Sequence, residues 1–76
     1  MPLDKLRILS GKEVCRILER NGFRELPRRG GSHIIMQKKI EDSTITVPVP
    51  DHKEIKIGTL HSIIRQSQLP KALFEV

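Results

Sequence analysis

The chain has 76 residues, with 14 Lys or Arg against 9 Asp or Glu, so its formal net charge is +5. This length suits one domain, taken as residues 1–76, and no apolar run approaches the roughly 20 residues of a membrane span. A single cysteine excludes an internal disulfide and a cysteine-based zinc site; with no signal-peptide pattern at the start of the chain, we expect a reducing, cytoplasmic location. A small basic domain most often binds an anionic partner, and nucleic acid is the first candidate.

The first predicted element is a helix from Ser10 to about Asn21. Ser10 and Glu13 have the spacing of a capping box, and Gly22 can adopt the left-handed conformation that ends a helix. One stripe of this helix is apolar and faces the core. The opposite stripe is a basic ridge, which suits either a solvated surface or an anionic partner. The ridge consists of Lys12, Arg16 and Arg20.

Three short antiparallel strands are predicted next, joined by two turns into a meander. We expect them at Phe23–Leu26, Ser32–Lys39 and Thr44–Val47. Alternation puts Ile34 and Met36 on the core face of the middle strand, and the other face of such a sheet can stay open to water. Pro48 and Pro50 cannot donate to a strand ladder, so the third strand is expected to end at them.

His33 is predicted to project from the open face, directly after the turn formed by residues 28–31. A solvated imidazole can act as a general acid or base near neutral pH. Position alone leaves both an ordinary surface histidine and a general base open, and favours the former. The three histidines and Cys15 match no metal-ligand spacing, so no metal site is expected.

A second helix is expected to begin near Gly58 or Thr59, with an apolar stripe of Leu60, Ile63 and Ile64, and to end before Pro70. The predicted fold class is therefore α+β: an αβββα chain order with a three-stranded antiparallel sheet and two helices packed on one face. This is the arrangement of double-stranded-RNA-binding domains.

Four sequence blocks point to a narrower resemblance. In order along the chain, they are Ser10-Gly11-Lys12-Glu13, Gly31-Ser32-His33, Thr46-Val47-Pro48 and Gly58-Thr59-Leu60-His61. Together with the residues between them, over about 8–69, they closely resemble HicA-family toxins. One departure is His61, where a basic residue is expected.

The resemblance implies an mRNA interferase, an endoribonuclease that acts as the toxin of a type II toxin–antitoxin system and inhibits translation. Its partners would be RNA and a HicB-type antitoxin, with no cofactor, and its catalytic residue would be His33. The residues expected to bind RNA or its phosphate groups are Lys12, Arg16, Arg20, Arg28, Arg29, Gly30, Gly31, Ser32 and Lys39. With no Trp or Tyr, base stacking would fall to the two phenylalanines, to His33 or to arginine planes.

Two other functions fit the same fold. One is a non-catalytic RNA-binding module, and the other is a catalytically silent homologue that acts through protein interaction with an acidic partner. Salt-sensitive binding without cleavage would indicate the first, and no RNA affinity at moderate salt would indicate the second.

Overall fold

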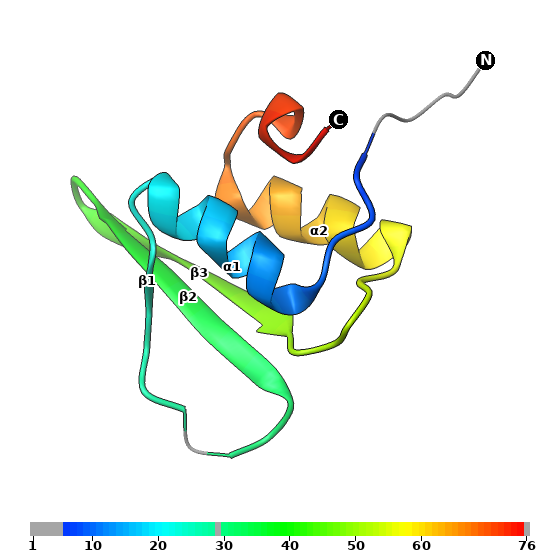
Figure 1. The fold of residues 1–76 in the computed structure, drawn as a ribbon. Coiled ribbons are helices and arrows are strands. Elements are labelled where there is room, and N and C mark those ends of the chain that lie inside the picture. Colours follow the sequence, from blue (N-terminus) through cyan, green and yellow to red (C-terminus); the bar gives the residue numbers. More distant parts are fainter. Residues whose placement is uncertain (1–5, 29, 76) are drawn as a thin grey trace.

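The computed structural model describes residues 6–28 and 30–75, so the interpretation of the first five residues and the prediction for Arg29 lie outside the described residues. The three strands form an antiparallel sheet in the order β1-β2-β3, and both long helices cover the same face of it (Figure 1). The elements are α1 (Gly11–Arg20), β1 (Arg24–Glu25), β2 (His33–Ile40), β3 (Ser43–Pro50), α2 (Ile57–Ser67) and the 3-10 helix η1 (Lys71–Phe74). The predicted α+β class and the αβββα order are confirmed.

The start of α1 is the predicted capping box. The Ser10 hydroxyl accepts a hydrogen bond from the Glu13 N–H at 3.1 Å, and the Glu13 carboxylate accepts one from the Ser10 N–H at 2.9 Å. These hydrogen bonds with Ser10 hold the pKa of the Glu13 carboxyl below its ordinary value. Two otherwise unpaired amides of the first turn are thereby satisfied within the helix.

The end of α1 is a Schellman motif. Phe23 donates its N–H to the Leu18 carbonyl at 3.0 Å, and Gly22 donates to the Glu19 carbonyl at 3.2 Å. Gly22 has φ of +98°, a conformation that favours glycine. The motif directs the chain back along the helix, so that β1 follows after only a short turn.

The third strand is longer than expected, because β3 continues through both prolines to Pro50. The N–H of Asp51 donates to the Ser32 carbonyl at 2.7 Å, so alternate residues of this strand direct their amides toward β2. Pro48 and Pro50 are at the intervening positions, and β3 is an edge strand, so their missing N–H groups cost no ladder hydrogen bond. The prediction that the strand ends at the prolines is wrong for this reason.

The core lies between the helices and the covered face of the sheet, as the periodicity predicted. Its buried apolar residues come from every long element: Leu9, Val14, Cys15, Ile17, Leu18, Phe23, Ile34, Met36, Ile45, Val47, Val49, Ile55, Leu60, Ile63, Ile64 and Phe74. Cys15 is a buried free thiol of this core, and burial raises its pKa to about 11.

Two smaller differences concern the C-terminal half. The second helix begins at Ile57, one residue before the predicted start. In the last segment, Phe74 is fully buried and Leu73 is 39% exposed. No helix in the described part of the chain is long and apolar enough to cross a membrane.

Candidate active site

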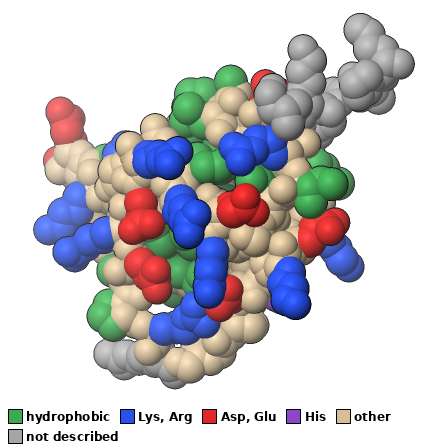
Figure 2. All heavy atoms as spheres, viewed as in Figure 1, with side chains coloured by type: hydrophobic (Ala, Val, Ile, Leu, Met, Phe, Trp, Pro, Cys, Tyr) green, Lys and Arg blue, Asp and Glu red, His purple; other side chains and the backbone are tan. Residues whose placement is uncertain are grey.

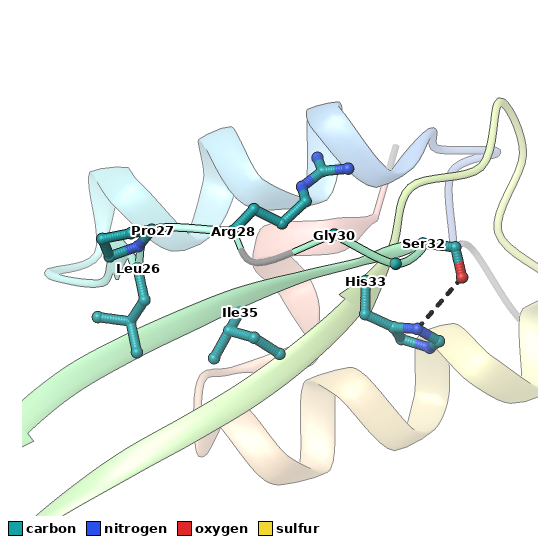
Figure 3. Close-up of a pocket in the computed structure, with 8 residues that line it drawn as sticks. Leu26, Pro27, Arg28, Gly30, Ser32, His33 and Ile35 are labelled. Carbon is teal, nitrogen blue, oxygen red and sulfur yellow. Dashed lines mark hydrogen bonds between the residues drawn. The ribbon is translucent and has the colours of Figure 1, made fainter.

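His33 is the first residue of β2, and its ring projects from the face of the sheet that the helices leave open. It is exposed and is paired in the strand register with Pro50. Figure 3 shows its side chain pointing to the same side as those of Leu26 and Ile35. These residues, with the loop that precedes β2, line a surface hollow of about 430 Å³. The histidine therefore lies at one end of a partly apolar depression that is open to solvent.

The loop beside His33 depends on two glycines. Gly30 has φ of +94° and Gly31 has φ of +85°, both in the region that side chains rarely adopt. A Cβ at either position would meet nothing within 4 Å, so backbone conformation and not space requires glycine here. Both glycines line the hollow and are exposed, which leaves the backbone next to His33 open to approach by a ligand.

Ser32 contacts the imidazole directly. Its hydroxyl lies 3.5 Å from His33 Nδ1, at the outer limit of a hydrogen bond (Figure 3). If Nδ1–H donates to this hydroxyl, the other ring nitrogen, Nε2, keeps a lone pair facing outward and can accept a proton. Ser32 can therefore orient the ring and select its tautomer.

Arg28 borders the same hollow, but its guanidinium is directed elsewhere. Its Nη2 atom lies 3.0 Å from Oδ2 of Asp51, and the two form an ion pair. Figure 3 shows the side chain pointing away from the imidazole of His33. Of the two arginines predicted at this turn, Arg28 is thus committed to Asp51, and Arg29 is outside the described residues.

A second hollow lies on the same face of the sheet, farther along β2. It is lined by Gly22, Arg24, Gln37 and Lys39. Lys39, predicted to face RNA, is exposed there, whereas Lys38 lies on the opposite face with its Nζ atom 5.9 Å from the Phe23 ring centroid. Sequence reasoning missed Arg24 as a site residue. The available signal was its spacing of two residues from Leu26, which puts both on the open face.

The basic ridge on α1 is not part of this site. Lys12, Arg16 and Arg20 are exposed, but α1 covers the other face of the sheet. Carboxylates lie among these cations: Lys12 and Arg16 line a groove together with Glu19 and Glu25. Figure 2 shows Lys and Arg side chains interleaved with Asp and Glu over this side of the molecule. The structure thus separates the predicted RNA-contacting residues into two groups on opposite faces.

The remaining histidines do not line the hollow at His33. His52 is exposed and lines a different hollow, with Pro50 and residues that lead into α2, and His61 is half-buried on α2. Across residues 6–28 and 30–75, no three His, Cys, Asp or Glu side chains gather into a group that could hold a metal ion. Among the described residues that line its hollow, His33 is the one side chain suited to proton transfer near neutral pH.

The chain matches a known protein family over most of its length. A search of curated proteins gives no match. A family model described as the HicA toxin of bacterial toxin–antitoxin systems matches residues 11–69. This span runs from the first residue of α1 to just beyond the end of α2, and it includes both hollows of the open face. The chain therefore belongs to the HicA toxin family, and the protein is the toxin of a toxin–antitoxin system.

Proposed function

We propose that this protein is an mRNA interferase, an endoribonuclease of a type II toxin–antitoxin system that cleaves RNA with His33 and thereby stops translation in the cytoplasm. Residues 1–76 would act as a single toxin domain. The observation that carries the proposal is the position of His33, an exposed imidazole beside a two-glycine turn in a hollow of the open sheet face. Membership of a toxin family supports it.

The chemistry needs a proton acceptor and a site for phosphate. The ribose 2′-oxygen attacks the adjacent phosphorus, forming a new P–O bond, while the bond from phosphorus to the 5′-oxygen breaks. Nε2 of His33 takes the 2′-hydroxyl proton while a solvent water gives a proton to the departing 5′-oxygen, or the two exchange these roles. The products are a 2′,3′-cyclic phosphate and a 5′-hydroxyl. Because the nucleophile belongs to the RNA, this route uses no metal-bound water.

Extra negative charge on the phosphoryl oxygens must be stabilised as the new bond forms. The exposed backbone around Gly30 and Gly31 can offer N–H groups to these oxygens, since neither residue has a side chain that would block approach. Ser32 would orient the imidazole through its contact with Nδ1. Arg29 would add positive charge, and Arg28 could do so after leaving Asp51.

The same face supports a proposal for the antitoxin. A HicB-type antitoxin that covers the open sheet face would block His33 and its hollow together. The ridge of Lys12, Arg16 and Arg20 could guide either RNA or an acidic antitoxin from the opposite side, where carboxylates interrupt the positive charge. The open face is therefore the better candidate for RNA binding.

Cleavage of an mRNA transcript tests the proposal directly. His33→Ala should lower the rate by about 10²–10⁴-fold, the usual contribution of a general acid–base group, with an unchanged circular dichroism spectrum. His52→Ala is the matched control, because it removes an exposed imidazole from a separate hollow and should keep the wild-type rate. Wild-type cleavage by His33→Ala would refute the catalytic assignment. Salt-sensitive RNA binding with no cleavage product from the wild type or from His33→Ala would indicate a non-catalytic module instead.

A further inference from the structure

The charged side chains that project from the open face of the sheet are all positive. Its outward residues in the register of the three strands are Arg24 on β1, then His33, Ile35, Gln37 and Lys39 on β2, and Thr44, Thr46 and Pro48 on β3. This set includes two cations and no carboxylate. Glu25 is on the opposite face, and the nearest acidic residues along β2, Glu41 and Asp42, are in the turn beyond the strand. The face is therefore complementary to a polyanion, in contrast to the mixed helix side in Figure 2.

The second hollow has the chemistry of a nucleotide subsite. Arg24 and Gln37 are direct partners in the register of β1 and β2, and Lys39 is the next residue of β2 on the same face. Gln37 donates its amide N–H to the Thr46 hydroxyl at 3.3 Å, which holds the amide on this face. Two cations can bind phosphate, and a fixed amide can hydrogen-bond a base edge.

The two hollows lie along β2, at a separation that one RNA strand can span. Gln37 is four residues from His33, which is about 13 Å at the rise of a β-strand. An RNA strand whose phosphate lies at His33 would therefore bring a nucleotide beyond the immediate neighbour of the reacting one to Arg24 and Lys39. The side chains of Leu26 and Ile35, which line the first hollow, provide an apolar surface between His33 and Gln37.

The apolar surface formed by Leu26 and Ile35 favours single-stranded RNA over a duplex. Bases can lie on an apolar surface only when they are unpaired and turned toward the protein. Both phenylalanines are buried in the core, so stacking on this face falls to His33 and to the guanidinium plane of Arg24. Duplex RNA would present its phosphates here and leave Ile35 without a partner.

We propose that Arg24, Gln37 and Lys39 form a second RNA-binding subsite, which holds single-stranded substrate on the open sheet face beside the nucleotide cleaved at His33. This subsite rests on the proposed nuclease function, but it makes a separate prediction about binding. It would determine how tightly the substrate binds and which nucleotide is accepted a short way along the strand from the cleavage position, without taking part in proton transfer.

The test measures binding and cleavage separately. Binding of a fluorescently labelled single-stranded RNA is followed by anisotropy at several salt concentrations, in the His33→Ala background so that no cleavage occurs. Each phosphate contact in single-stranded RNA adds about 0.7 to the slope of log affinity against log salt, so Arg24→Ala with Lys39→Ala should lower the slope by about 1.4. Between 50 and 200 mM salt, the affinity of the parent should then fall about 7-fold more than that of the variant.

The matched control removes one arginine and one lysine from elsewhere. Lys53→Ala with Arg65→Ala changes exposed residues of the loop before α2 and of α2 itself, and it should leave the slope unchanged. In the active background, Arg24→Ala with Lys39→Ala should raise KM for a short single-stranded substrate and leave kcat near its wild-type value. Gln37→Ala should alter the nucleotide preference at a position a short way along the strand from the cleavage site.

Several results would overturn the subsite. One is an equal slope for the variant and its control, and another is equal binding of single-stranded and duplex RNA with no effect of the substitutions. Loss of antitoxin binding with unchanged RNA binding would assign the face to protein contact instead. A failure of the nuclease proposal is distinguishable, because it would show as cleavage by His33→Ala whatever the salt dependence of binding.

Discussion

Replacing Gly11 by alanine should destabilise this protein, although alanine is the better helix former. Gly11 is the first residue of α1, and its N–H donates to the carbonyl of His52 at 2.9 Å. A Cβ at this position would overlap the carbonyl oxygen of Pro50 and come within 3.2 Å of Asp51 Cα. These are backbone atoms at the end of β3, so no side-chain rotation can relieve the overlap.

The magnitude follows from two opposing effects. Overpacking of this kind costs about 1–3 kcal/mol, and the gain in helix propensity from glycine to alanine is at most about 1 kcal/mol. We therefore expect Gly11→Ala to lower the free energy of unfolding by about 1–2 kcal/mol. In a domain of this size each 1 kcal/mol shifts Tm by about 4–8 °C.

Gly58 provides the matched control. It is the second residue of α2, it is exposed, and a Cβ there would meet nothing within 4 Å. Gly58→Ala should therefore leave stability unchanged or raise it by up to about 1 kcal/mol. The chain has no Trp or Tyr, so unfolding is best followed by far-ultraviolet circular dichroism in urea and on heating. Shifts of the same sign in both variants would refute the argument from close backbone approach.

Four further predictions concern the cap, the thiol and the ion pair. Ser10→Ala should cost about 1 kcal/mol by urea denaturation. Because the folded pKa of Glu13 is lowered, its contact stabilises the fold at neutral pH and is lost as pH falls through that pKa, so Glu13→Gln should make stability less sensitive to acid. Since the pKa of Cys15 rises from 9.0 to about 11, its thiolate fraction at neutral pH falls about 100-fold, and thiol reagents should modify the native protein far more slowly than the unfolded one. Asp51→Asn should change stability by less than about 1 kcal/mol, because the pair is partly exposed, and should raise RNA affinity in anisotropy measurements if Arg28 then contacts RNA.

Local signals in the sequence predicted most of the fold. The capping box at Ser10 and the left-handed residue at Gly22 involve atoms a few residues apart, so spacing alone is informative. Alternation along β2 likewise placed Ile34 and Met36 in the core and His33 on the open face. These features follow from short-range spacing and from the backbone periods of 3.6 and 2.0, which are visible in the spacing of residues along the sequence.

What the sequence did not predict depends on how strands and helices meet. Pro48 and Pro50 were expected to end β3, and only the edge position of that strand makes them harmless. Arg24 was not singled out because β1 is so short that the spacing of Arg24 from Leu26 is its one sign of alternation. The ion pair between Arg28 and Asp51 joins positions 23 apart in the chain, which no local pattern could indicate.

The fold changes the interpretation of the net charge more than that of any other feature of the sequence. The excess of positive residues between positions 12 and 39 divides between two faces of the sheet. On the helix side it is diluted by Glu13, Glu19 and Glu25. On the open face two cations remain, and none of the outward-facing strand residues is a carboxylate. A weaker concentration of charge can thus make the better RNA surface, because the sign of the local field, and not the count of lysines and arginines, determines where a phosphate chain binds.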